Sequence, residues 1–83
     1  MRLRSSDVSL RALGNETIVL SLPTSQYFTA TGVGSRLLEL LGEDVDVDDL
    51  VAAVVAEYEI DGDTARQDVE KFIGRLRDAQ LLH

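Results

Sequence analysis

The chain has 83 residues, no cysteine and a formal net charge of −7 at pH 7. Its length suggests a single domain with a small core, and the lack of cysteine excludes disulfides and thiolate metal sites. Nine acidic residues and no basic ones lie between Glu43 and Asp63, a surface that repels nucleic acid and anionic lipid. Without a signal peptide or an apolar span, we expect a cytoplasmic protein whose partners include neither nucleic acid nor membrane.

Three strands are expected in the first third of the chain, at about 7–12, 17–22 and 26–31. In the first segment Val8, Leu10 and Ala12 alternate with more polar residues, and in the second Ile18, Leu20 and Leu22 alternate with Val19 and Ser21, as in half-buried strands. Strand-favouring residues fill the third. Gly14-Asn15 marks the first turn, and Pro23, which cannot donate to a ladder, ends the second strand.

The register of these strands is predicted by requiring that the apolar residues share one face. A two-residue loop would mix the faces, whereas a three-residue loop of Gly14, Asn15 and Glu16 pairs Leu10 with Leu20. The same rule pairs Leu20 with Phe28 and places Tyr27, Thr29 and Thr31 on the other face. The expected inner face then consists of Val8, Leu10, Ala12, Ile18, Leu20, Leu22, Phe28 and Ala30.

Three helices are expected next, at about 32–41, 47–58 and 63–80. Thr31 and Asp46 have N-cap chemistry, and Asp61 or Asp63 begins the third helix. The apolar stripes are Val33, Leu37, Leu40 and Leu41, then Leu50, Val51, Val54, Val55 and Tyr58, then Ala65, Val69, Phe72, Ile73, Leu76 and Ala79. Three strands followed by three helices predict an α+β domain over 1–83, with a three-stranded antiparallel sheet beside a three-helix bundle.

No catalytic or metal site is expected. The only histidine is His83, a terminal residue, so neither a Ser-His-Asp nor a Cys-His system can be built. The segment EDVDVDDL lacks the glycine and the bidentate glutamate of a calcium loop, and GVGSR lacks the lysine of a phosphate-binding loop. We therefore expect a protein that is not an enzyme and carries no cofactor.

The third strand, Gln26–Thr31, has a neighbour on one side only. Its other edge presents free N–H and C=O groups, which are normally an aggregation hazard. Two interpretations are open: the third helix covers this short strand, or an extended peptide adds to the edge beside a helix.

The segment SQYFTATGVGSRLLELLGE resembles the third strand and first helix of PqqD-like proteins, the RiPP recognition elements. Tyr27 and Phe28 match the family's aromatic pair, Ala30 the inward apolar position and Thr31 the cap. VDVDDLVAAVVAEYEID and ARQDVEKFIGRLRDAQLL resemble the second and closing helices. Ala30 is smaller than the usual leucine, which is expected to widen the pocket beneath it. Gln80 stands where glycine is common, so a different end to the last turn is expected.

The resemblance implies a winged helix-turn-helix-like adaptor that binds the leader segment of a ribosomally synthesised precursor peptide. The leader becomes an antiparallel strand on the third strand and packs against the third helix. Stand-alone proteins of this length look most like those of lasso-peptide biosynthesis, which implies a transglutaminase-like cysteine protease as the leader peptidase. The implied peptide-binding residues are Tyr27, Phe28, Thr29, Ala30, Thr31, Val69, Phe72, Ile73 and Leu76, with electrostatic contacts from Arg66, Lys71, Arg75 or Arg77.

Two alternatives remain. A PqqD-like peptide chaperone could serve a radical-SAM enzyme, a cyclodehydratase or another maturation enzyme, including one of cofactor biosynthesis. A winged-helix DNA-binding protein would need a basic recognition helix, whereas the turn into the second helix reads GEDVDVDDL.

Overall fold

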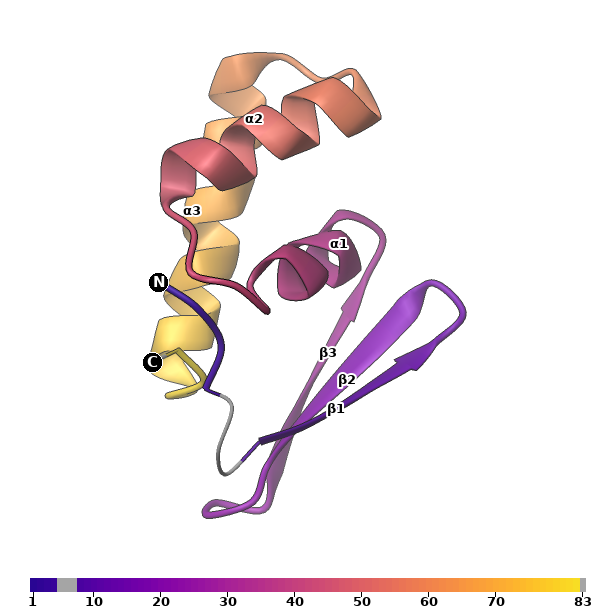
Figure 1. Ribbon diagram of the computed structural model, residues 1–83, viewed down its shortest axis with the longest axis vertical. Coiled ribbons are helices and arrows are strands. Elements are labelled where there is room, and N and C mark those ends of the chain that lie inside the picture. Colours follow the sequence, from indigo (N-terminus) through magenta and orange to yellow (C-terminus); the bar gives the residue numbers. More distant parts are fainter. Residues whose placement is uncertain (5–7, 83) are drawn as a thin grey trace.

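The structure, a computed structural model, describes residues 1–4 and 8–82. Strands β1 (Val8–Leu13), β2 (Glu16–Ser21) and β3 (Gln26–Thr31) precede helices α1 (Val33–Leu40), α2 (Val47–Tyr58) and α3 (Gly62–Asp78). The strands form one antiparallel sheet in the order β1-β2-β3, and α1 lies between this sheet and the α2–α3 pair (Figure 1). The α+β prediction is confirmed; Asp7, expected in the first strand, and His83 lie outside the described residues.

The predicted register of the sheet is wrong by one residue. The loop between β1 and β2 has two residues, Gly14 and Asn15, so Leu10 pairs with Val19, and Val19 pairs with Phe28. Gly14 has a φ of 64° at the first loop position, as a type II′ hairpin turn requires. Both hairpins therefore place a different set of β2 side chains on the core face.

The core face of β2 carries Thr17 and Val19, which are buried, while Ile18 and Leu20 point to the opposite face. The hydroxyl of Thr17 pairs with the hydroxyl of Ser35 in α1, which compensates for burying a polar group. The less hydrophobic side of β2 thus faces the core, because α1 supplies the partner for its one buried hydroxyl.

This register gives a stability test. Replacing Val19 with alanine should lower the free energy of unfolding by about 2 kcal/mol, because Val19 is 1% exposed. Replacing Leu20 with alanine should lower it by less than about 1 kcal/mol, because Leu20 is 36% exposed. Urea unfolding of both variants measures the difference, and the opposite ranking would restore the other register.

The start of α1 differs from the prediction. Its N-cap is Gly32, at φ 58° and ψ −123°, and no side chain caps the helix, so Thr31 is not the cap. Gly34 lets α1 approach closely, because a Cβ there would lie 3.2 Å from the Ala30 Cβ and 3.0 Å from Phe72 Cε1. The small side chain of Ala30 is thus matched by a glycine in α1, which brings helix backbone against it.

The N-termini of α2 and α3 are capped by aspartate. The Asp46 carboxylate accepts from the Asp49 N–H, and the Asp49 carboxylate accepts from the Asp46 N–H. These two bonds form a capping box. Asp61 caps α3 by accepting from both the N–H and the hydroxyl of Thr64, and these bonds lower the pKa of Asp61. Tyr58, predicted on the apolar stripe of α2, is exposed at the end of that helix.

Helix α3 ends at Asp78, two residues before the predicted end, in a Schellman motif. The Leu81 N–H donates to the Leu76 carbonyl, and the Gln80 N–H donates to the Arg77 carbonyl. Gln80 therefore adopts the left-handed conformation, at φ 59°, where glycine is favoured. The helix ends in the usual geometry despite the unusual residue.

Replacing Gln80 with glycine should raise the free energy of unfolding by about 1 kcal/mol, because the left-handed conformation strains a residue with a Cβ. Gln67→Gly is the matched control: Gln67 is exposed inside α3, and glycine there should lower stability by about 1 kcal/mol. Chemical denaturation of both variants measures the two effects. Destabilisation by both would show that Gln80 is not strained.

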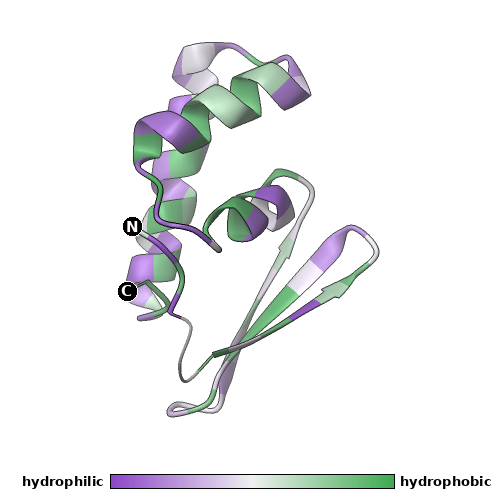
Figure 2. Cartoon of the chain, viewed as in Figure 1, coloured by the Kyte–Doolittle hydropathy of each residue, from purple (hydrophilic) through white to green (hydrophobic). Residues whose placement is uncertain are grey.

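The helices cover only part of the sheet. Helix α1 packs on β2 and β3, and α2 packs on α3, so residues of β1 stay open: Leu10 is 51% exposed. Figure 2 shows hydrophobic and hydrophilic residues alternating along α3, whose buried side contributes Ala65, Val69, Phe72, Ile73 and Leu76 to the core. Among the described residues, no helix is long and apolar enough to cross a membrane.

Candidate functional site

The outer edge of β3 carries backbone groups that are directed away from the sheet. The Gly32 N–H donates to the Asn15 carbonyl across the β2–β3 register, which marks these residues as a hydrogen-bonded pair. Hydrogen-bonded and non-hydrogen-bonded pairs alternate along antiparallel strands. The N–H and C=O groups of Tyr27, Thr29 and Thr31 therefore point outward, and across the described residues no backbone bond from another element reaches them.

Helix α3 lies beside this edge through an aromatic contact. The rings of Phe28 and Phe72 meet edge to face, with their centroids 5.7 Å apart and their planes at 74°. The guanidinium carbon of Arg75 lies 4.9 Å from the centroid of the Phe28 ring, a cation–π distance. The free edge of β3 is thus flanked by two aromatic rings and one cation.

The two faces of β3 differ in character. Phe28 and Ala30 point inward, as the sequence predicts, and are half-buried and buried respectively. Tyr27, Thr29 and Thr31 are exposed on the other face, and Tyr27 is 74% exposed. A strand added to this edge would therefore have one side toward α3 and the other toward solvent.

Most of the apolar α3 residues that were expected to contact a peptide lie in the core. Val69 and Leu76 are fully buried, and Ile73 is 3% exposed. Phe72 is 8% exposed and contacts Phe28 directly. The core beneath the β3 edge thus contains Val69, Ile73 and Leu76. Phe72 extends from this core to contact Phe28 at the edge.

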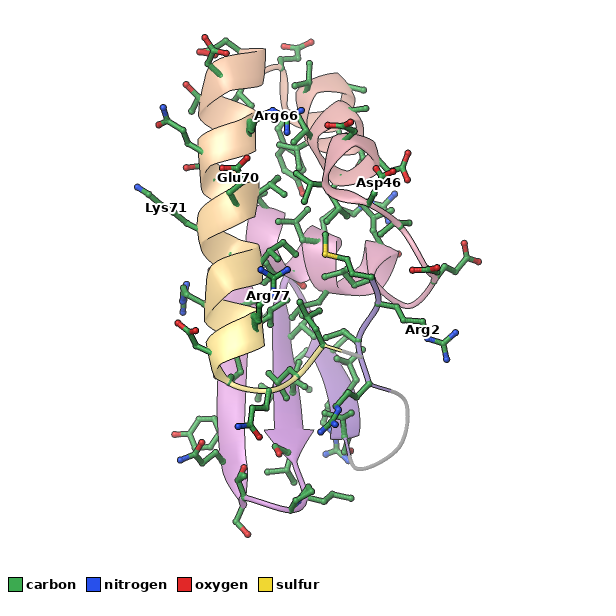
Figure 3. The ribbon with its side chains drawn as sticks, turned by 90° about the vertical axis from the view of Figure 1, so that its left-hand side faces the viewer. Arg2, Asp46, Arg66, Glu70, Lys71 and Arg77 are labelled. Atoms are coloured by element: carbon green, nitrogen blue, oxygen red, sulfur yellow. The ribbon has the colours of Figure 1, made fainter. Side chains whose placement is uncertain are left out.

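The four cations proposed from the sequence lie in different surroundings. Arg66 donates to Asp48 of α2 at 2.6 Å and lies 3.8 Å from Glu70; the bond to Asp48 raises its pKa. Figure 3 shows Arg66 directed toward α2 and Lys71 projecting from the other side of α3. Within the described part of the chain, Lys71, Arg75 and Arg77 form no ion pair.

Which cation lies at the strand edge was not predictable from spacing. Arg75 follows Phe72 by three residues, so both occupy the side of α3 that faces β3. Arg77 lies three helical turns after Arg66 and is therefore on the same side of α3 as Arg66. The Phe28 ring contact singles out Arg75. This contact depends on how α3 is placed against β3, which the sequence does not show.

The described residues form cavities but no candidate metal site. They contain no group of three or more His, Asp or Glu side chains that could hold a metal ion. A cavity of about 210 Å³ lies at β1, lined by residues that include Leu3, Leu10 and Val19, and a smaller one lies between β1 and α1. Neither of these cavities is at β3, and strand addition needs a free edge rather than a closed cavity.

The fold and the open edge of β3 define a PqqD-like domain. The chain belongs to the family described as coenzyme PQQ synthesis protein D (PqqD), which matches residues 16–82. It is similar to TbiB1 in its complex with the TbiA(β) leader peptide: 34% identity, a TM-score of 0.90, and coverage of 100% of this chain and 95% of that one. The predicted family is thus confirmed.

A second solved structure supports the fold. It is a lasso peptide synthetase B1 complexed with the leader peptide, with 18% identity, a TM-score of 0.83, and coverage of 96% of this chain and 93% of that one. No curated protein matches the chain.

Proposed function

We propose that this protein binds the leader segment of a ribosomally synthesised precursor peptide as an added strand on β3. The observation that carries the proposal is the free backbone edge at Tyr27, Thr29 and Thr31, beside the Phe28–Phe72 contact. The likeness to TbiB1, which is solved with a leader peptide, supports it.

The geometry divides the contacts into two kinds. An antiparallel leader would exchange main-chain hydrogen bonds with Tyr27 and Thr29, which provide affinity with little dependence on sequence. Leader residues opposite Phe28 and Ala30 would share their face and point toward α3, because directly paired residues lie on the same side of a sheet. Every second leader side chain would therefore contact Phe28, Phe72 and their neighbours.

The protein acts as a non-enzymatic adaptor in this proposal, and the chemistry belongs to a partner. A lasso-peptide pathway is the best-supported setting, since both similar solved structures contain a leader peptide and one is a lasso peptide synthetase B1. The partner would then be a transglutaminase-like cysteine protease that removes the leader.

The other candidates have less support. A peptide chaperone for a radical-SAM or other maturation enzyme would use the same edge and fits the family description. DNA binding would need a basic surface, whereas the first turns of α2 present Asp46, Asp48 and Asp49.

Replacing Thr29 with proline should weaken leader binding by about tenfold or more, because proline removes an N–H that points to the free edge. Proline is tolerated where the N–H faces away from the sheet, so circular dichroism should be nearly unchanged. Isothermal titration with the TbiA(β) leader peptide measures the affinity.

Ala12→Pro is the matched control for this variant. By the same alternation, the Ala12 N–H points to the outer edge of β1, on the far side of the sheet. This variant should fold and bind like the unaltered protein. Equal affinity of the folded Thr29→Pro and Ala12→Pro variants would rule out strand addition at β3.

Purified protein incubated with a precursor peptide should leave the mass of that peptide unchanged. The reason is that the hydroxyls with side-chain partners in the described residues serve the fold: Thr17 and Ser35 pair with each other, and Thr64 donates to Asp61, the N-cap of α3, whose lowered pKa makes it a weak base. Mass spectrometry over a range of protein concentrations provides the measurement. Cleavage at a rate proportional to the protein concentration would refute the adaptor role.

A further inference from the structure

Arg75 is a cation that has no carboxylate partner among the described residues. The chain carries 15 acidic and 8 basic residues, and two other helix arginines have acidic partners: Arg36 bonds to Glu57 at 2.9 Å, and Arg66 bonds to Asp48. Arg75 has no ion pair or hydrogen bond with any other described residue. Its guanidinium instead lies against the ring of Phe28.

This contact holds the guanidinium at a defined place while its donors stay available. The group lies over the ring face, 4.9 Å from the centroid, and stacking on an aromatic face leaves the N–H groups at the guanidinium rim free to donate. Arg75 is exposed, so the group is reachable from solvent. A fixed guanidinium with free donors is suited to a carboxylate.

The strand geometry limits where that carboxylate can come from. Phe28 points inward from β3, and a residue directly opposite it on an added strand would point to the same face. The residues two positions away along that strand also share this face. Residues opposite Tyr27 and Thr29 point away from Arg75.

We infer that Arg75 is a specificity-determining residue that binds an aspartate or glutamate of the leader, placed opposite Phe28 or two residues from that position. This inference rests on the proposed strand addition at β3. It assigns to the leader an acidic residue on the same face as its apolar contacts. Lys71 and Arg77 lack the ring contact that fixes Arg75, so they do not share this role.

The experiment uses a series of TbiA(β) leader peptides, each with a single glutamate substitution at a different position. Titration calorimetry measures the affinity of each peptide. With the unaltered protein, the inward-facing position next to Arg75 should bind about three- to tenfold more tightly than the positions on either side of it. Arg75→Gln should abolish this preference. Arg77→Gln, the matched control on the same helix, should keep it.

A charge reversal gives an independent readout. Arg75→Glu should reverse the preference, so that lysine at the same leader position binds more tightly than glutamate. Nuclear magnetic resonance of the backbone amides in each complex reports whether the peptide lies on β3.

The failures of the two ideas are distinguishable. Suppose that the peptide protects the β3 amides, but the glutamate series shows no preference for the inward-facing position, or this preference survives Arg75→Gln. The role of Arg75 is then wrong and strand addition stands. If the peptide leaves the β3 amides unprotected, strand addition is wrong and the role of Arg75 falls with it.

Discussion

The proposed function depends on the outer backbone edge of β3, which no other described element pairs. Buried or half-buried N–H and C=O groups need partners, and an open strand edge readily pairs with other chains. Here the outward groups belong to the exposed residues Tyr27, Thr29 and Thr31 of a strand that contacts α1 and meets α3 through the Phe28–Phe72 contact. The described part of the fold holds this edge in place but does not pair it, so the strand proposed to add there would complete an existing sheet.

In the proposed complex, the position of α3 would give the edge its selectivity. Phe72 brings the helix to Phe28, and Arg75 lies on the same ring. The close approach of α1 at Gly34, against Ala30 and Phe72, fixes the strand and the helix relative to each other. Main-chain pairing alone would accept many peptides, whereas under the proposal these fixed side chains would discriminate among alternate residues of the added strand.

The sequence was sufficient for the architecture, because local signals there were unambiguous. The N-cap chemistry of Asp46 and the apolar stripe predict α2 with the bounds that the structure shows, and the alternation in β3 correctly places Phe28 and Ala30 inward. It failed for β2, where both faces carry apolar residues. The inward choice depends on a turn of two residues and on Ser35, which pairs with the buried Thr17. Thr31 failed as a cap because Gly32 enters α1 through a backbone conformation that needs no side-chain cap.

The candidate site followed less directly. A third strand with one neighbour left two interpretations open, and the resemblance to PqqD-like proteins implied an added peptide beside the closing helix. Helical spacing could not separate Phe72, which reaches the edge, from Val69 and Leu76, which are buried. It also could not show that Arg66 is held by Asp48 while Arg75 lies over Phe28, because both facts depend on how α2 and β3 are placed around α3.

Residue-resolved amide exchange, with and without a saturating TbiA(β) leader peptide, tests the central claim most directly. The account predicts an alternating pattern in β3: the amides of Tyr27, Thr29 and Thr31 gain protection on binding, while those of Phe28 and Ala30 are already protected by β2 and change little. Protection confined to residues 43–58, or no change at Tyr27 and Thr29 with the peptide bound, would contradict it.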